Sequence, residues 1–338
     1  MERRAKSLSP TLPHQGEGAP LTASPLTIPS PLEGEGGEAD EVTPRDGASG
    51  SATGITSLSA AALIGPATVI VVILLVAPLV VLFRYSLNRF VPGKFMVDAV
   101  TVENYVKVFL DPYYRAVLLR TGLIAALCTA LCLVLGYPAA YMLARTRSRF
   151  KTWLVLLVVM PLFVGNAVRA AGWMVVFGRQ GAFNSALTWL GIVDAPLDIM
   201  YTPLAVIVGI TGFNLPFMVL TLQSVIEGID PALEEAALGM GARPLRAFSR
   251  VTLPLSLPGV VAGSLLCFIL AMNAYANPVL LGGPRFQMMA PVVYTQISEQ
   301  SNWPLGGALA FVLMTATLAL TVGAHALVQR RYRRRGIV

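Results

Sequence analysis

Long apolar runs are the feature that most constrains how this chain folds. Six such runs, each of more than 20 residues, follow one another along the chain. A run of about 20 apolar residues crosses the roughly 30 Å hydrocarbon core of a bilayer as a helix. The runs are uniformly apolar rather than alternating, so helices are favoured over a barrel as the way to satisfy backbone groups in lipid. The pattern predicts an all-α integral membrane protein with six transmembrane helices. The spans expected are 60–83, 117–144, 152–177, 203–226, 255–280 and 306–328.

Composition agrees with a membrane protein. Only 13% of the residues are charged and 55% are hydrophobic, whereas soluble domains carry about 25% charged residues. We attribute the net charge of +7 to membrane topology, because no basic patch interleaved with aromatics indicates a nucleic-acid partner. Cys128, Cys132 and Cys267 all lie inside apolar runs. Their number and spacing favour buried small hydrophobic residues over disulfides or a metal site.

The first 54 residues differ from the rest. They are rich in Pro, Gly, Ser and Glu and have no periodic apolar face. Such a segment buries too little surface to offset chain entropy, so 1–54 is expected to be a disordered, low-complexity extension. The run "SPLEGEGGE" resembles translated intergenic repeat DNA, and one alternative is a start codon assigned too far upstream. In either case, residues 55–338 are expected to form the membrane domain.

The positive charges predict the orientation in the membrane. Lys and Arg cluster at 145–151, at 243–250 and at 330–335. Short loops rich in Lys and Arg favour the cytoplasmic side. With six spans these three regions share one side with the N-terminus, so both ends are expected in the cytoplasm. The loop at 84–115 also carries basic residues and would lie on the opposite side, but acidic residues partly offset them. Three basic regions against one favour the cytoplasmic N-terminus.

The loop between the fourth and fifth spans has its own local structure. It reads "EEAALGMGARPLRAFSRVTLP" from Glu234 to Pro254. Asp230 can cap a helix that has Pro231 at its first position. Gly239 and Gly241 allow a turn with positive φ, and Pro244 starts a second short helix. The pattern predicts an ordered helix–turn–helix at the membrane face rather than a solvated connector.

This loop resembles the EAA loop of permease subunits of bacterial binding-protein-dependent ABC importers. The family pattern is Glu-Ala-Ala, three residues, Gly, nine residues, Ile, one residue and Leu-Pro. Val251 stands where the family prefers Ile and keeps a β-branched apolar side chain. The residues that match the pattern are Glu235, Ala236, Ala237, Gly241, Leu253 and Pro254.

The resemblance implies a role for the loop and a set of partners. The loop would be a coupling helix that docks on an ATP-binding cassette subunit dimer, with ATP and Mg²⁺ bound by those partners and no cofactor in this chain. Glu235 would make the polar contact with the ATPase subunit. Ala236 and Ala237, with their small side chains, would leave the docked face without protruding groups, and Gly241 would make the turn. The other implied partners are a second permease subunit, a periplasmic solute-binding protein, the small-molecule solute and the lipid of the bacterial inner membrane.

A wider resemblance points to a solute class. "MPLFVGNAVRAAGW" in the third run and "PVLLGGPRFQMMAPVVYTQI" after the fifth resemble the first permease subunit of the spermidine/putrescine group. The resemblance therefore implies polyamine uptake. No Asp or Glu lies inside any predicted span, however, and Arg169 would repel a polycation. The alternative is that this chain resembles a related permease that carries an anionic or neutral solute.

Polar residues inside the apolar runs are candidates for the solute path. Intramembrane charge is costly and usually faces a bundle interior or a water-filled cavity. The alternative for Arg169 is a snorkelling or hydrogen-bonding role, and the asparagines can equally bond between helices. The candidates are Asn166, Arg169 and Trp173 in the third span and Asn273, Tyr275 and Asn277 in the fifth.

Other functional classes fit less well. The phosphate loop G-x-x-x-x-G-K does not occur, so the chain is not expected to be the ATPase itself. An ion-coupled secondary transporter commonly carries intramembrane acidic residues and inverted repeats, which we do not find. A membrane enzyme would need clustered acids, bases or metal ligands, and no catalytic or metal site is expected.

Overall fold

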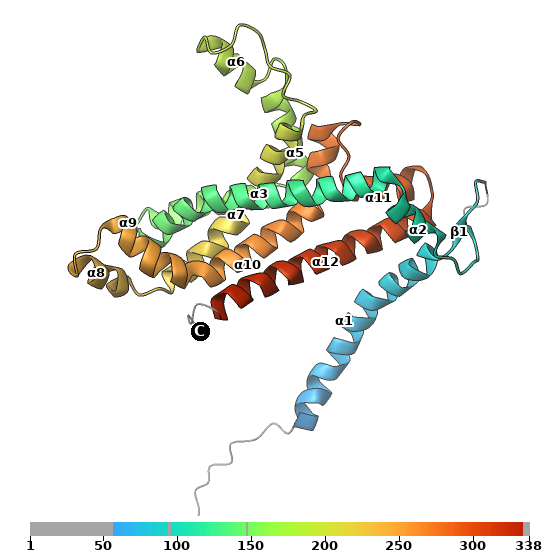
Figure 1. The fold of residues 1–338 in the computed structure, drawn as a ribbon, viewed down its shortest axis with the longest axis horizontal. Coiled ribbons are helices and arrows are strands. Elements are labelled where there is room, and N and C mark those ends of the chain that lie inside the picture. The colour runs from blue at the N-terminus through green and yellow to red at the C-terminus, as the bar shows by residue number, and fades with distance from the viewer. Residues whose placement is uncertain (1–56, 94–95, 147, 334–338) are drawn as a thin grey trace, which may run out of the picture. The chain divides into compact units, whose positions relative to one another are not determined.

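The computed structural model describes residues 57–93, 96–146 and 148–333. The predicted extension at 1–54 lies outside these residues, and the description below concerns the unit Ala62–Val338. Within the described residues the chain is helical apart from one short antiparallel ribbon (Figure 1). The elements are α1 (Ser57–Ser86), β1 (Arg89–Phe90), β2 (Met96–Val97), α2 (Glu103–Leu110), α3 (Pro112–Arg145), α4 (Lys151–Val159), the 3₁₀ helix η1 (Met160–Phe163), α5 (Asn166–Phe177), α6 (Ala182–Trp189), α7 (Pro203–Glu227), α8 (Pro231–Gly239), α9 (Pro244–Ala247), the π-helix η2 (Phe248–Thr252), α10 (Leu253–Met272), the π-helix η3 (Pro278–Gly282), α11 (Met289–Tyr294), the π-helix η4 (Thr295–Glu299) and α12 (Trp303–Arg333).

Long apolar helices account for most of the predicted spans. In the part of the chain that the structure describes, five helices are long and apolar enough to cross a membrane, or six if one bent pair counts as a single span. The first, second, fourth and sixth predicted spans correspond to α1, α3, α7 and α12. The fold class is therefore confirmed as all-α with several membrane-spanning helices.

The third predicted span is not one helix. α4 and η1 end at Phe163, and the chain resumes as α5 and α6 after a bend of 99°. Val164 and Gly165 have extended backbone conformations at the break. Pro161 lacks the N–H that a continuing helix needs, and Gly165 favours the helix poorly. The expectation of a single span over 152–177 is therefore wrong in its continuity.

The fifth predicted span ends earlier than expected. α10 stops at Met272 rather than near Leu280. The Asn273 side chain donates a 2.9 Å hydrogen bond to the Ile269 carbonyl one turn back, where it competes with the helix ladder. Pro278, which also lacks an N–H, then opens the short π-helix η3. The residues predicted as the outer end of this span are thus an irregular segment.

The centre of the bundle is formed by α3, α7 and α10, which pack on one another, with α12 against α10 (Figure 1). Glycines allow the close approach. A Cβ on Gly136 would lie 2.9 Å from Met218, and one on Gly259 would lie 2.9 Å from Val225. Small residues at such contacts are typical of membrane helix pairs.

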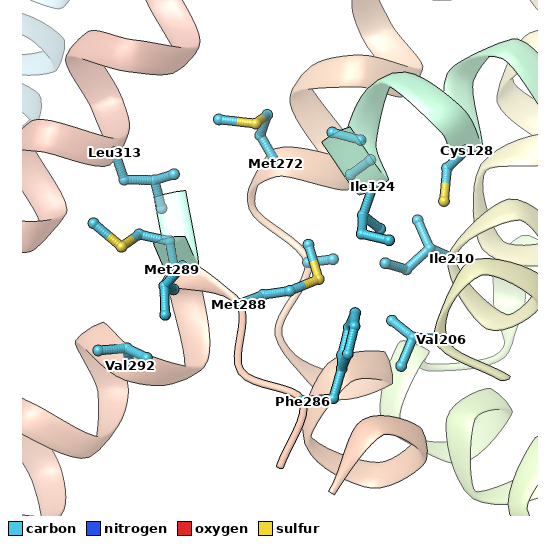
Figure 2. Packing of buried hydrophobic residues seen from close by; sticks show 14 of the residues in the cluster. Ile124, Cys128, Val206, Ile210, Met272, Phe286, Met288, Met289, Val292 and Leu313 are labelled. Atoms are coloured by element: carbon cyan, nitrogen blue, oxygen red, sulfur yellow. The ribbon is translucent and has the colours of Figure 1, made fainter. Parts of the chain in front are cut away.

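Buried apolar side chains fill the space between these helices and α11. Figure 2 shows Ile124 and Cys128 of α3 facing Ile210 of α7, with Met288 and Met289 on the segment that leads into α11. All three cysteines are free and fully buried, which confirms the prediction that they act as small core residues.

The first helix has few neighbours in the described chain. No residue of α1 from Thr68 to Tyr85 is buried. Its end is attached through Phe83, whose ring packs edge-on against Phe311 of α12 at 5.3 Å, and through Ser86, whose hydroxyl lies 2.7 Å from that of Tyr105 in α2. The exposed apolar side of α1 is free to meet lipid or another subunit.

Candidate functional site

The loop between α7 and α10 is ordered as predicted. The Asp230 carboxylate accepts a 2.9 Å hydrogen bond from the backbone N–H of Ala232 and caps α8. α8 and α9 form the expected helix–turn–helix. Of the two turn glycines only Gly241 has a positive φ, at +86°. Gly239 is the last residue of α8, so the prediction of a turn with positive φ is wrong for Gly239.

The residues of the EAA pattern divide between the outer face of this loop and its root. Glu235 and Ala236 are exposed, and Ala237 is half-buried. Leu253 and Pro254 are half-buried at the start of α10. The outer face therefore consists of a carboxylate and two small side chains, while the last two pattern residues anchor the loop to the bundle.

Large apolar side chains surround this exposed face. Met240 and Leu245 are 83% and 82% exposed, and Leu233 and Leu238 are also exposed. Four exposed apolar side chains in a segment that joins two spans favour a protein partner over water. The sequence pattern did not single out these four residues, which lie on α8, in the turn and on α9.

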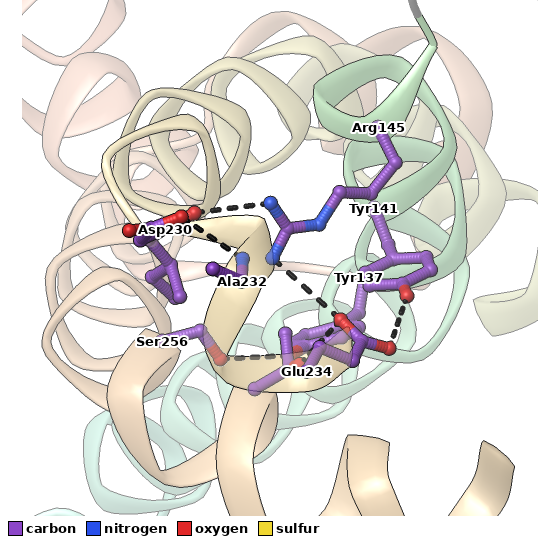
Figure 3. A network of polar contacts seen from close by, with 9 residues as sticks. Tyr137, Tyr141, Arg145, Asp230, Ala232, Glu234 and Ser256 are labelled. Carbon is purple, nitrogen blue, oxygen red and sulfur yellow. Dashed lines mark hydrogen bonds and ion pairs between the residues drawn. The ribbon is translucent and has the colours of Figure 1, made fainter. Parts of the chain in front are cut away.

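The inner face of the loop is held by Glu234, which the sequence pattern did not single out. Its Oε1 accepts a 2.8 Å hydrogen bond from the Tyr141 hydroxyl, and its Oε2 accepts one of 2.9 Å from the Thr252 hydroxyl. Arg145 Nη2 lies 3.6 Å from the same Oε2, and Arg145 Nη1 donates a 3.0 Å hydrogen bond to the Ile229 carbonyl. Figure 3 shows Tyr141 and Arg145 of α3 both reaching Glu234 of α8.

A second set of contacts joins the same elements. The Tyr137 and Ser256 hydroxyls lie 2.7 Å apart, which links α3 to α10 (Figure 3). Tyr137 and Tyr141 each pack edge-on against Phe248 of η2, with ring centroids 5.5 Å apart. One end of α3 is thus fixed to the loop by polar and aromatic contacts together.

The polar residues predicted in the third span lie on α5 and face α7. The Arg169 guanidinium stacks on the Phe213 ring at 4.5 Å, while its Nε and Nη1 are buried without a hydrogen-bond partner. Asn166 Oδ1 is likewise buried without a hydrogen-bond partner. Trp173 stacks on Phe177 at 5.0 Å. All three candidates therefore lie on one helix directly after the 99° break.

The residues predicted in the fifth span lie beyond its end and separate from one another. Asn277 is buried, and its Oδ1 would lie 3.1 Å from a Cβ on Gly209 of α7. Asn273 lines a groove of about 460 Å³ between α10, α11 and α12. Tyr275 is 38% exposed and its ring lies 4.9 Å from that of Tyr294. The structure thus places Asn277 and the α5 residues against α7, and Asn273 toward α12.

Comparison with protein families identifies the chain. The model of the family described as "Binding-protein-dependent transport system inner membrane component" matches residues 132–334, which contain the helix–turn–helix loop and all the polar candidates. The chain belongs to this family. It is therefore an inner-membrane permease subunit of the ABC importer class, as the loop pattern had indicated.

Curated relatives of this permease cover most of its length. The spermidine/putrescine transport system permease protein PotB of Salmonella typhimurium is 36% identical over 252 residues, which are 72% of this chain and 88% of that protein. PotB of Escherichia coli is 38% identical over 231 residues, 68% of this chain and 82% of the relative. The molybdenum transport system permease protein ModB of Mycobacterium bovis is 32% identical and covers 63% of this chain and 80% of ModB.

Solved structures agree on the fold. A chain of a bacterial ABC transporter that imports the acidic polysaccharide alginate superimposes with a TM-score of 0.64 at 18% identity, over 80% of this permease and 94% of that chain. The inward-facing MetNI methionine transporter gives a TM-score of 0.51 at 18% identity, over 64% of this permease and 94% of the MetNI chain. At this identity the likeness concerns the fold alone.

Proposed function

We propose that this permease imports polyamines, with spermidine or putrescine as the solute. The observation that carries the proposal is the 36–38% identity to PotB proteins over 68–72% of the chain. Relatives with other names match more weakly, since ModB of Mycobacterium bovis is 32% identical over 63% of the chain. The solute would cross by alternating access between an inward-facing and an outward-facing state.

The proposed assembly contains four kinds of partner. A second permease subunit would complete the path, two ATP-binding cassette subunits would bind ATP and Mg²⁺, and a periplasmic solute-binding protein would deliver the solute. The exposed face of α8 and the following turn, with Glu235, Met240 and Leu245, supports docking of an ATPase subunit at this loop. We count six spans, with the bent pair α4–α6 as the third, and place both chain ends in the cytoplasm.

Uptake of labelled spermidine tests the solute. The permease is expressed with the transport genes beside it in cells that lack their own polyamine uptake. We expect spermidine to accumulate, and excess unlabelled putrescine to compete while molybdate does not. A matched strain with Leu245→Glu places a charge on the exposed loop face and should lose uptake, although the chain stays in the membrane. Unchanged background uptake with the intact permease would contradict the polyamine proposal.

One observation favours a second candidate, an anionic solute. Arg169 carries two buried N–H groups without a partner in the described structure, and such groups favour an anion that accepts hydrogen bonds. Calorimetry on the binding protein encoded beside the permease separates the two candidates. Sub-micromolar binding of spermidine or putrescine supports the polyamine proposal. Tight binding of an anion with no polyamine binding supports the second candidate and makes Arg169 a path residue.

A further inference from the structure

The loop that faces the ATPase has two adjacent carboxylates with opposite surroundings. Glu235 is exposed at a pocket of about 310 Å³ that Tyr141 and Arg145 also line, whereas the Glu234 side chain is only 17% exposed and is bonded to α3. On a helix, adjacent residues are about 100° apart, so one outer and one inner carboxylate follow from the phase of α8. The outer residue suits a partner, and the inner residue contacts only this chain's own elements in the described structure.

The contacts of Glu234 join three elements that are distant in sequence. The two oxygens of Glu234 on α8 accept hydrogen bonds from Tyr141 near the end of α3 and from Thr252 at the end of η2, and Arg145 at the end of α3 lies within ion-pair distance. Arg145 also bonds the Ile229 carbonyl directly before α8. A carboxylate with charge-assisted bonds to several donors fixes direction as well as distance. These contacts therefore link α8 to the end of α3 at two side chains.

We propose that Glu234 is a positioning residue that makes α8, η2 and the adjoining end of α3 one rigid body, so that movement imposed on the loop reaches the helix bundle. The inference rests on the proposed role of the loop as the docking site of the ATPase. It adds the path by which the force leaves the loop, through Tyr141 and Arg145 into α3.

Stability alone does not explain this arrangement. A partly buried ion pair contributes little net stability, because desolvation offsets the attraction between the charges. Arg145 Nη2 lies within ion-pair distance of Glu234 but makes no hydrogen bond, and Nε is also unpartnered. Buried N–H groups without partners call for a reason. A positioning role for the Glu234–Arg145 pair supplies a reason that net stability does not.

Distance measurements between spin labels test the rigid body without reference to the solute. Cysteines replace the exposed residues Ala232 on α8 and Met142 on α3, while the three native cysteines are fully buried. In the assembled complex we expect one narrow distance that stays the same with and without ATP. Glu234→Gln keeps the shape but removes the charge and should broaden the distribution. A distance that changes on ATP binding in the unaltered loop would overturn the proposal.

Coupling gives the functional readout. In proteoliposomes that contain the whole complex, we expect Glu234→Gln to hydrolyse ATP at a rate within two-fold of the parent and to move at least five-fold less spermidine per ATP. Tyr141→Phe removes a single hydrogen bond and should act in the same direction more weakly. It also keeps the proposal testable if Glu234→Gln assembles poorly. Adding Tyr141→Phe to Glu234→Gln should lower coupling no further, because the two groups act as a unit.

Two control variants distinguish the positioning role of Glu234 from the docking role of the loop. Glu103→Gln changes an exposed carboxylate on α2 that pairs with Arg89 and should alter neither readout. Leu245→Glu should abolish ATPase binding if the loop is the docking site. Suppose that Leu245→Glu blocks ATPase binding while Glu234→Gln leaves the amount of spermidine moved per ATP unchanged. The positioning role of Glu234 is then refuted and the docking role of the loop stands. If Leu245→Glu still binds the ATPase, the docking role of the loop and the positioning role of Glu234 are both refuted.

Discussion

At the scale of single residues, Gly239 and Gly241 lie two positions apart and yet differ in backbone conformation. Gly241 has a φ of +86°, and a Cβ added there would have nothing within 4 Å. A β-branched residue is disfavoured at such a φ by about 1–2 kcal/mol. We expect Gly241→Val to leave membrane insertion intact but to misplace α9 and abolish uptake, as measured by membrane-fraction blots and labelled-solute uptake.

The matched control for this prediction is Gly239→Ala. Gly239 is helical and also has open space around its Cβ position, so Ala should stabilise α8 by about 0.5–1 kcal/mol and leave uptake unchanged. Normal uptake by Gly241→Val would mean that the turn conformation does not matter for coupling. A loss of uptake in both variants would instead show that the loss does not depend on the positive φ of Gly241.

The sequence predicted half of this site at residue level. Glu235, Ala236 and Gly241 were identified because they fall on a fixed spacing, and the structure gives them the exposed face and the turn. Glu234 was missed, because its role depends on the phase of α8 relative to α3. That phase is set by contacts to Tyr141, 93 positions away in the sequence. No local pattern encodes which of two adjacent glutamates points inward.

At the scale of elements, glycines fix the distance between α7 and α10. A Cβ on Gly259 would lie 2.9 Å from the Cβ of Val225, and one on Gly263 would lie 2.8 Å from the Met218 sulfur. We expect Gly259→Leu to force the helices apart and lower the stability of the detergent-solubilised protein by about 1–3 kcal/mol. The measurement is the loss of monodisperse protein on heating, followed by size-exclusion chromatography.

Gly122→Leu is the control for this packing prediction. Gly122 lies in α3, and a Cβ there meets nothing within 4 Å in the described structure. Equal losses of thermal stability in Gly122→Leu and Gly259→Leu would show that the α7–α10 contact is not responsible, because Leu favours the helix more than Gly does at both positions. A normal melting profile for Gly259→Leu would contradict the close approach itself.

The break in the third span shows what hydropathy leaves out. The run over 152–177 is as apolar as its neighbours, and its proline was visible. Prolines also lie inside α1, α3, α7 and α10, and those helices continue through them. Gly165 follows Pro161, but Gly259 and Gly263 follow Pro258 within the continuous helix α10, so what differs at Pro161 is the set of contacts that α5 then makes to α7 and η3. Such tertiary contacts decide between a kink and a break, and a single sequence does not reveal them.

At the scale of the whole molecule, charge predicts which end of the bundle faces the cytoplasm. The end that carries α8 and α9 has Arg243, Arg246 and Arg250. The segment from α6 to α7 carries Asp194 and Asp198, and Arg179 lies 3.6 Å from Asp198. Positive charge is retained on the cytoplasmic side. We therefore expect the loop to lie in the cytoplasm and the tip of α6 in the periplasm.

Labelling of single cysteines tests this orientation. Trp189 beside the tip of α6 and Leu245 in α9 are 85% and 82% exposed, so the two positions are matched in accessibility. Cys128, Cys132 and Cys267 are fully buried and should not react. With the chain expressed without its partners, we expect a membrane-impermeant maleimide to label Trp189→Cys in intact spheroplasts and Leu245→Cys only after permeabilisation. The reverse pattern would invert the topology and would also rule out docking of a cytoplasmic ATPase at this loop, because α8 would then face the periplasm.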